Sequence, residues 1–349
     1  MKPDELLRLR LHHQQISRPR ARSAGEVVSS LVAMQAQEFA MARWAIGLRM
    51  AGKVRDADIT NAFNAGEILR THVMRPTWHF VAPADIRWLL ELTAPRVHAA
   101  NAYSYRKHGL DAAVFKRSDA VLTRALRGRC LTRTALQGIL AKSGVKAEGE
   151  RLSGIVMHAE LEGLICSGPR EGRQFTYALL DERAPSAPPR TRSAALSELS
   201  HRYFASRGPA TAQDFATWSG LTLRDARAGM DSLSKEFRRE VIDGIDYVYR
   251  PGTAAAPSAT GITFLMPDYD EYGMSYKDRR AMFSPAAVRG KLRHNRMIIA
   301  SGKIVGSWRR SPTGDIELQY SGPMSGAQLA AIARALRKFS AFTGSDSGP

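Results

Sequence analysis

Gln35 and Gln37, two glutamines separated by one residue, are the side chains of this sequence best suited to take part in a reaction. An amide cannot act as a general base, but it can orient a water molecule and turn a carbonyl dipole toward developing positive charge. That contribution suits hydrolysis of a bond whose leaving group is already activated. The ordinary alternative is a pair of amides on a solvated helix surface, so the rest of the chain has to support the interpretation.

The spacing of the two amides imposes a structural condition. In a regular helix, residues i and i+2 point about 200° apart. Both amides therefore reach one substrate only if the helix ends or distorts between Met34 and Glu38. Glu38 is a competing general base, although acidic residues suit helix N-termini and a surface carboxylate at the start of the next helix is the preferred interpretation.

The chain is strongly basic. In 349 residues, 51 Lys and Arg stand against 33 Asp and Glu, a net charge of +18, which favours a polyanionic partner through phosphate neutralisation and counterion release. Half of this excess lies in residues 272–310, where ten basic residues accompany one acid. Residues 106–133 carry eight basic residues and two acids. Each segment alone has the alternative of being a solvated face.

Other chemically capable residues have simpler interpretations. Cys130 and Cys166 are too few for a disulfide framework or a zinc site, and we expect reduced core thiols. Asp268, Asp270 and Glu271 lack further ligands at metal spacing, and salt bridges to nearby arginines are preferred. The tryptophans are core residues by default, with Trp78 as a conceivable exception if its strand faces DNA. No metal or cofactor is expected.

The N-terminal segment has no apolar signal region, and no window approaches 18 uncharged apolar residues. These patterns predict a cytoplasmic protein.

Two proline-containing linkers, 184–190 and 251–260, divide the chain. Before the first, helices over Thr132–Leu140 and Gly149–Glu162 precede strands over Leu164–Ser167 and Gln174–Leu179. This order of helix, helix and hairpin is that of a winged helix, placed at 109–183. The order recurs at 191–250, with helices over Thr211–Trp218 and Thr222–Leu233 and a hairpin turning at Asp243-Gly244.

Residues 1–108 permit a third copy. Helical patterns precede two strands joined by a turn at Arg75-Pro76; the segments are Glu5–His13, Ala24–Ala33, Phe39–Met50, Asp56–Ala65, Glu67–Met74 and Thr77–Val81. Residues 261–342 form a different, basic α/β region with short strands and a final helix over Ser325–Phe339, and 343–349 read as a disordered tail. The fold class is therefore mainly α with β-hairpin wings (α+β): three tandem winged-helix domains and a C-terminal β-containing region.

With these segments in hand, the chain resembles the AlkZ/YcaQ family of bacterial DNA glycosylases. The resemblance covers roughly Leu6 to Phe339 and is specific when its motifs are taken together. The motifs are Leu31–Gln37, Arg70–Val81, Asp214–Leu221, Leu265–Tyr272 and Tyr276–Arg279. Gln35 and Gln37 match the Gln-x-Gln branch, whereas the other branch looks like Gln-x-Asp.

The resemblance implies hydrolysis of the N-glycosidic bond of purines alkylated at N7 or N3, with Gln35 and Gln37 as catalytic residues. A purine of this kind is cationic, so its departure needs no further protonation. The family's lesion-facing hairpin corresponds to Arg75 and its flanks. The lesion-pocket residues implied are His72, Arg75, Pro76, Thr77 and His79, although structural roles are the default for the two histidines.

The sequence thus predicts a monofunctional DNA glycosylase of base excision repair that binds double-stranded DNA with alkylated or crosslinked purines, as a monomer associated with the nucleoid. The residues expected to bind the DNA backbone are Arg117, Arg151, Arg170, Arg173, Lys277, Arg279, Arg280, Lys291 and Arg293. The alternative is a non-enzymatic winged-helix regulator or nucleoid protein, which needs the same charge and folds. The preferred lesion, and whether crosslinks are opened, are left undecided by the sequence.

Overall fold

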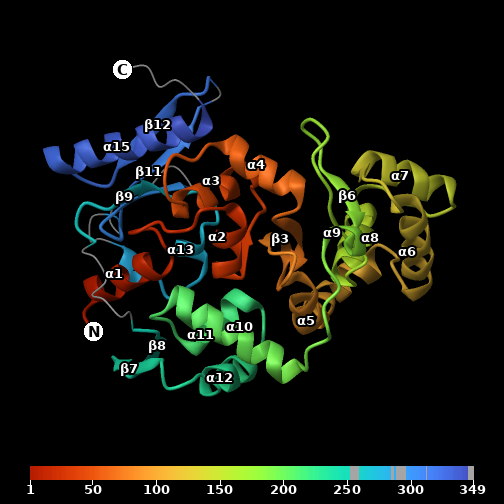
Figure 1. Cartoon of the computed structure of the whole chain (residues 1–349), viewed down its shortest axis with the longest axis horizontal. Helices are drawn as coiled ribbons and strands as arrows, with labels where there is room; N and C mark the ends of the chain where they lie inside the picture. The colour runs from red at the N-terminus through yellow and green to blue at the C-terminus, as the bar shows by residue number, and fades with distance from the viewer. Residues whose placement is uncertain (252–258, 284–286, 288–295, 312, 345–349) are drawn as a thin grey trace.

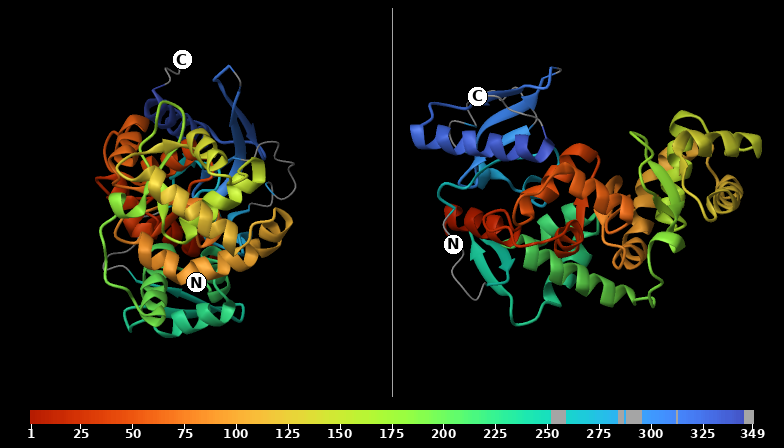
Figure 2. Two further views of the ribbon diagram at one scale, coloured as in Figure 1. Left: turned by 90° about the vertical axis from the view of Figure 1, so that its right-hand side faces the viewer. Right: turned by 45° about the horizontal axis from the view of Figure 1, so that its top comes forward.

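The structure is a computed structural model that describes residues 1–251, 259–283, 287, 296–311 and 313–344. In Figure 1 the N-terminal unit, red to orange, lies in the middle of the molecule. The C-terminal region (blue) covers one side of it and residues 191–250 (green) cover another, while residues 109–183 (yellow) project at one end (Figure 2). The N-terminal unit therefore contacts each of the other three parts.

The N-terminal unit surrounds a three-stranded antiparallel sheet of order β1-β3-β2 with helices. Its elements are α1 (Pro3–His13), α2 (Ala24–Leu31), β1 (Ala33–Gln35), α3 (Phe39–Arg49), α4 (Asp56–Ala65), β2 (Leu69–Val73), β3 (Arg75–Val81) and α5 (Ile86–Lys107). Ser23 begins α2 because its side chain accepts a hydrogen bond from the N–H of Glu26.

The helix expected over Ala24–Ala33 is shorter than the sequence suggested. It ends at Leu31, and the next residue, Val32, has a φ of 66°. Arg207 donates hydrogen bonds to the carbonyl of Leu31, the last residue of the helix, and to that of Ala33 in the strand that follows. A tertiary contact thus stops the helix, and the residues that follow form strand β1.

The turn expected at Arg75-Pro76 is also misplaced. Both residues begin β3, and the turn consists of Met74, whose φ is 63°. Val73 pairs directly with Arg75 across this tight connection. Arg75 is therefore a strand residue beside the hairpin tip.

Residues 109–183 form a unit with a core of its own. Its elements are α6 (Ala112–Leu126), β4 (Leu131–Thr132), α7 (Arg133–Lys142), α8 (Gly149–Leu161), β5 (Ile165–Ser167), β6 (Thr176–Leu179) and α9 (Leu180–Arg183). Thr132 caps α7 as expected, accepting the N–H of Ala135 at 3.2 Å. Buried apolar residues between positions 105 and 177 form a separate hydrophobic cluster.

Residues 191–250 have the same order of helix, helix and hairpin but share their core with the N-terminal unit. The elements are α10 (Arg192–Arg207), α11 (Ala212–Ser219), α12 (Leu223–Asp231), β7 (Arg238–Ile242) and β8 (Ile245–Tyr249). Capping boxes at Thr211 and Thr222 begin α11 and α12. Tyr203 and Phe215 belong to the same buried cluster as Ala33 and Val81 of the first sheet.

The C-terminal region packs a four-stranded antiparallel sheet of order β12-β11-β10-β9 against the N-terminal unit. Its elements are β9 (Thr263–Leu265), α13 (Glu271–Met274), the 3₁₀ turn η1 (Arg280–Met282), β10 (Arg296–Ala300), β11 (Lys303–Arg310), β12 (Ile316–Tyr320) and α15 (Gly326–Thr343). The buried pair Arg49–Asp270, 2.8 Å apart, joins α3 to the segment before α13. Helix α15 includes Thr343, where the tail was expected to begin, and Gly344 caps it.

The α+β fold class is confirmed, and the helix, helix and hairpin order occurs where the second and third winged helices were expected. Residues 185–190 of the first linker contain neither helix nor strand, and residues 252–258 of the second lie outside the described part of the chain. The domain boundaries themselves stay predictions. Among the described helices, none combines the length and the apolar character needed to cross a membrane.

Candidate active site

Strand β1 is an edge strand and presents alternate residues to two different cores. Gln35 pairs with His79 and Met34 pairs with Phe80. Because successive side chains of a strand point to opposite faces, Gln35 shares a face with Ala33 and His79, and Met34 lies on the other. Ala33 joins the core made with residues 191–250, and Met34 joins the core made with the C-terminal region. The strand is thereby fixed from both sides.

Five polar side chains gather on the Gln35 face, from the end of β1 and from alternate positions of β3. They are Gln35, Gln37, Arg75, Thr77 and His79. The spacing condition posed by the two glutamines is met because Gln35 ends β1, Gln37 follows it, and their side chains reach alternate residues of β3, Arg75 and Thr77. The helix that would have separated the amides has already ended at Leu31.

Gln35 is half-buried and held at both its backbone and its side chain. Its N–H donates to Oε1 of Glu271 at 3.0 Å, and its side-chain Oε1 accepts a hydrogen bond from Nη2 of Arg75 at 3.3 Å. Arg75 also donates to the carbonyl of Trp218. Burial lowers the pKa of Arg75, yet a guanidinium stays charged at neutral pH. The amide is therefore oriented by a fixed cation.

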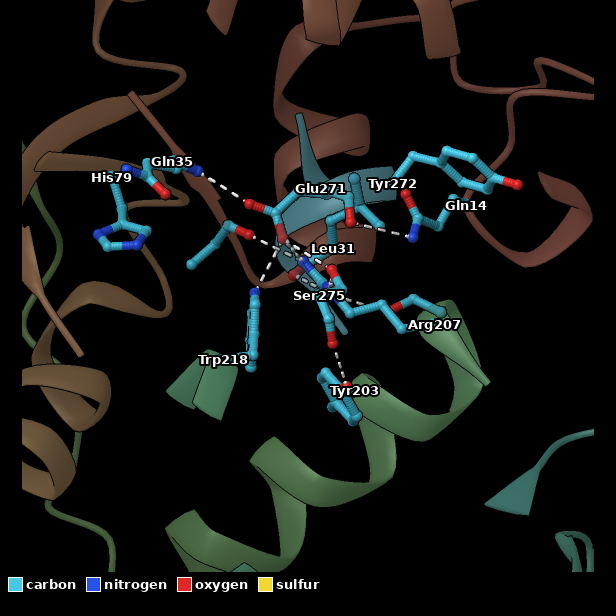
Figure 3. Close-up of polar contacts among 12 residues, drawn as sticks. Gln14, Leu31, Gln35, His79, Tyr203, Arg207, Trp218, Glu271, Tyr272 and Ser275 are labelled. Carbon is cyan, nitrogen blue, oxygen red and sulfur yellow. Dashed lines mark hydrogen bonds and ion pairs between the residues drawn. The ribbon is translucent and has the colours of Figure 1, made fainter. Parts of the chain in front are cut away.

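Glu271 is the anionic centre behind β1 (Figure 3), and its side chain is 1% exposed. One carboxylate oxygen, Oε2, accepts hydrogen bonds from Arg207 at 2.8 Å, Trp218 Nε1 at 2.8 Å and Ser275 Oγ at 3.1 Å. Burial alone would raise the pKa of Glu271, but the charge and hydrogen bond of Arg207 and the N–H of Gln35 lower it to about 2. The carboxylate is ionised at neutral pH and accepts hydrogen bonds at both of its oxygens.

His79 is fully buried beside Gln35 and is neutral. Its Nδ1 lies 3.0 Å from the carbonyl oxygen of Thr77, and its Nε2 lies 3.1 Å from Nη2 of Arg75. This pattern assigns the proton to Nδ1, since a carbonyl can only accept and a guanidinium can only donate. Burial, and then the positive charge of Arg75, lowers the pKa of His79 to about 3.

Gln37 and Glu38 are more exposed. The side-chain Oε1 of Gln37 accepts a hydrogen bond from Thr77 Oγ1 at 2.9 Å. Glu38 is the residue before α3, and its side chain makes no capping hydrogen bond. This is the surface position at the start of the next helix that the sequence favoured.

The expected lesion-pocket residues do not all lie on one face. His72 pairs with Trp78 on the opposite face of the sheet, where its Nδ1 contacts Glu160 of α8 and its ring lies 4.4 Å from that of Trp78. Arg70 stacks over Trp78 at 4.2 Å on the same side. Pro76 is exposed and alternates with Arg75 and Thr77 along β3. The structure therefore places His72 and Pro76 apart from the glutamines, with which the sequence had grouped them.

Comparison with known proteins places the chain in a family. The family model for AlkZ-like DNA glycosylases matches residues 28–342. The chain belongs to the AlkZ-like DNA glycosylase family. The "Interstrand DNA cross-link repair glycosylase" of Streptomyces sahachiroi is 25% identical over 317 residues, 84% of each chain. The solved structure of the Streptomyces sahachiroi DNA glycosylase AlkZ aligns with a TM-score of 0.81 over 99% of this chain and 97% of that one, at 19% identity.

Membership of this family confirms that the protein is a DNA glycosylase, and the non-enzymatic alternative is set aside. The site has the elements that such chemistry can use: two amides on one face, one of them held by a cation, and a buried neutral imidazole. Preorganised dipoles of this kind stabilise charge that develops in a transition state. Glu38 is the carboxylate next to the glutamines in sequence, and the carboxylate of Glu271 already accepts hydrogen bonds at both of its oxygens.

The expected backbone-binding residues of the second unit fall into two classes. Arg117 and Arg173 are exposed. Arg151 donates to the carbonyls of Lys146 and Gly109, each at 2.8 Å, and so ties α8 to the preceding turns. Arg170 stacks on the rings of Phe39 and Phe175 at 5.0 and 4.9 Å. Arg151 and Arg170 therefore have structural contacts that the sequence did not indicate.

In the C-terminal region, Lys277 and Arg279 are exposed, and Arg280 pairs with Asp278. Lys291 and Arg293 lie outside the described residues. The salt bridges expected for the three acids are confirmed, as Asp268 with Arg296, Asp270 with Arg49 and Glu271 with Arg207. Both cysteines are free; Cys166 is buried and Cys130 half-buried.

Sequence reasoning missed the supporting residues Arg207, Trp218 and Ser275. Glu271 was recognised only as one member of an acidic segment. The motif residues around Trp218 and Glu271 matched the family as blocks, but Gln35 and Glu271 are 236 positions apart, and nothing local to either signals the contact. Within the described residues, no group of three or more His, Cys, Asp and Glu side chains could hold a metal ion.

Proposed function

We propose that the protein is a monofunctional glycosylase that hydrolyses the N-glycosidic bond of purines made cationic by alkylation at N7 or N3. The supporting observation is the pair of amides on one face, Gln35 and Gln37, with side-chain oxygens held by Arg75 and Thr77. These two partners are an arginine and a threonine, neither of which forms a Schiff base with a sugar. Hydrolysis by water, without a covalent enzyme intermediate, is the reaction they suit.

The reaction needs no proton donor from the protein, because the lesion already carries a positive charge. As the base departs, it becomes neutral, and positive charge moves to the sugar as an oxocarbenium-like ion. The two glutamines position the attacking water, a contribution of about 3 kcal/mol for one well-placed group. An unmodified purine would need a proton donor, and neither amide is a strong acid, so the site also discriminates against normal DNA.

We extend the proposal to interstrand crosslinks. The relative from Streptomyces sahachiroi is named an "Interstrand DNA cross-link repair glycosylase" and aligns with 84% of this chain. A crosslink through purine nitrogens carries the same cationic leaving group as a methyl adduct, so the same two amides serve both. The strand that bears the glutamines is an edge strand, and Gln37 at its end is exposed.

Binding to duplex DNA would rest on exposed basic residues of two parts, Arg117 and Arg173 in residues 109–183 and Lys277 and Arg279 before the C-terminal sheet. These side chains would contact phosphates rather than bases, so affinity would depend on salt and hardly on sequence. We propose that the protein does this as a monomer, since the three-part frame around β1 comes from one chain. Its DNA substrate would place it at the nucleoid.

The test is base release from defined lesions. Purified protein is incubated with duplexes that carry one N7-methylguanine, one N3-methyladenine or one interstrand crosslink, and alkali then cleaves the abasic sites formed. We expect strand cleavage with the wild type and at least tenfold less, on the order expected for one lost dipole, with Gln35→Ala. Equal cleavage by both proteins would contradict the assignment of the site, and no cleavage of any lesion by the wild type would contradict the proposed substrate class.

A further inference from the structure

Gln35 belongs to a closed ring of hydrogen bonds that joins four elements. Its N–H donates to Glu271 Oε1 at 3.0 Å, and Glu271 Oε2 accepts from Trp218 Nε1 at 2.8 Å. The carbonyl of Trp218 accepts from Nη1 of Arg75. The ring closes where Nη2 of Arg75 donates to Oε1 of Gln35 at 3.3 Å. Figure 3 shows the half of this ring around Glu271, with the Trp218 indole and the Gln35 backbone directed at one carboxylate.

Arg75, the residue that donates to the Gln35 side chain, determines which way the Gln35 amide faces. A side-chain amide has an acceptor and a donor end, which exchange when the group turns by 180°. A guanidinium only donates, so Arg75 is compatible with Oε1 facing it and not with the NH₂ group. The hydroxyl of Thr77 can donate or accept, so it does not select an orientation for Gln37. The two amides of the motif therefore differ in how strictly they are oriented.

Residues 191–250 hold Arg75 in place. The carbonyl of Trp218 that accepts from Arg75 lies near the end of α11, two residues before Gly220. Gly220 has a φ of 71°, and a Cβ there would lie 2.1 Å from the carbonyl oxygen of Met74 at the hairpin tip. The absence of a side chain thus lets the end of α11 approach the β2–β3 hairpin closely enough for the Arg75 contact.

We propose that Arg75 is a positioning residue: it fixes the Gln35 amide with its oxygen toward β3, so that the NH₂ group is left to donate a hydrogen bond to the attacking water, and residues 191–250 serve to anchor it. This rests on the proposed role of Gln35 in base release. His79, neutral and bound to the same guanidinium nitrogen, completes the anchor from within the strand. Arg75 acts through Gln35, with no contact to the reacting bond of its own.

A double-mutant cycle tests this dependence. Single-turnover rates of base release are measured at saturating enzyme for the wild type, Arg75→Met, Gln35→Ala and the double variant. We expect Arg75→Met to slow release by about 10 to 100-fold in the wild-type background and by less than about 3-fold when Gln35 is already alanine, because groups that act as one unit are not additive. Equal slowing in both backgrounds would overturn the proposal.

A matched control is available on a neighbouring helix. Arg96 of α5 donates to the carbonyl of Gly220 at 3.3 Å, so Arg96→Ala removes an arginine contact to the same turn without touching Gln35. Its rate should equal that of the wild type. Arg75→Lys, which keeps the charge and can donate to only part of the ring, should recover a fraction of the activity; if Arg75→Met does not fold, this variant replaces it in the cycle, with the same two outcomes.

A second measurement does not depend on activity. In protein labelled with ¹⁵N-glutamine, the side-chain amide signals of Gln35 are assigned by their loss in Gln35→Ala. We expect them to lie apart from the signals of solvent-exposed glutamines, to move toward those positions in Arg75→Met, and to stay unchanged in Arg96→Ala. Unmoved signals in Arg75→Met would overturn the proposal. If the wild type released no methylated base but these signals behaved as expected, the proposed function would fail and the orientation of Gln35 would stand.

Discussion

Residues 109–183 and 191–250 have the same local order of helix, helix and hairpin but differ in how much of their hydrophobic core they share with the rest of the molecule. The first unit has most of its buried apolar residues in a cluster of its own, between positions 105 and 177. The second has no separate cluster among the described residues, and its Tyr203, Phe215 and Trp218 are buried together with residues of the first sheet. One is a nearly independent body, and the other packs against strands β1 and β3.

The two units therefore differ in what their arginines contact. Arg207 and Trp218 of residues 191–250 bind Glu271 behind strand β1. Arg117 and Arg173 of residues 109–183 are exposed. Similar secondary structure thus braces the strand of the candidate site in one case and presents exposed basic residues in the other. The following experiments test this difference.

The largest effect is expected when the buried ion pair behind the site is opened. Arg207→Met leaves Glu271 as an uncompensated buried charge, which should lower the free energy of unfolding by about 3–5 kcal/mol, because both side chains are almost completely buried. Urea denaturation measures the change. The exposed pair Arg192–Asp225 of the same unit is the control, and Arg192→Ala should cost no more than about 1 kcal/mol. Equal losses would mean that residues 191–250 do not brace the strand.

The next effect concerns the rate of base release. Gln35→Ala and Gln37→Ala should each slow release by about 10 to 1,000-fold, the range for a lost oriented dipole, with little change in affinity for undamaged DNA. Single-turnover kinetics and fluorescence anisotropy measure the two quantities. Glu38→Gln is the control for a carboxylate base at the neighbouring position, and a larger loss there than at either glutamine would move the chemistry to Glu38.

The third effect concerns the dependence of binding on salt. If about six phosphates are neutralised, the logarithm of the association constant should fall with the logarithm of salt concentration at a slope of about −5. Reversing Arg117 and Arg173 to glutamate should make the slope shallower by up to about 2 units, since each lost contact removes about 0.9. Reversing Arg224 and Arg227 on α12, which are also exposed, should leave it unchanged. A shallower slope there would show that residues 191–250 bind DNA as well.

The smallest effect is a dependence of stability on pH. His79 has a pKa of about 3 in the folded protein against an ordinary value of 6.5, so the unfolded chain binds a proton more readily between these two values. Its contribution to stability is therefore complete above pH 6.5 and decreases as the pH falls toward 3. The difference in unfolding free energy between the wild type and His79→Gln should shrink from pH 7 to pH 5. A constant difference would mean that the pKa of His79 is the same in the folded and the unfolded protein.

Much of the fold could be predicted from the sequence because its signals are local. Thr132, Thr211, Thr222 and Ser325 each begin a helix by accepting a backbone N–H, and such caps can be read from a few consecutive residues. The hairpin of β7 and β8 turns at Asp243-Gly244, both with positive φ, as that dipeptide indicates. By contrast, no pattern indicated α5, which has no side-chain cap and contains a proline at position 95.

The candidate site could be predicted only in part, because its frame is made of distant contacts. The apolar residues before Gln35 continue the pattern of α2, whereas the contacts that favour a strand there come from β3 and from Arg207, which is more than 170 positions away. Met74 has a positive φ although it is neither glycine nor asparagine, so the sequence placed the turn at Arg75-Pro76 instead. The motif itself was recognisable, and the strand that carries it was not.

Strand β3 has one face toward the glutamines and the other toward residues 109–183. Thr77 and His79 lie on the first, and Trp78, which stacks with His72 and Arg70, lies on the second. A single inserted or deleted residue within β3 would exchange the two sets of side chains. During evolution this strand can therefore change residue types on either face, but its length can change only in steps of two. Among homologues, gaps of one residue should be absent between positions 75 and 81 even where sequence identity is low.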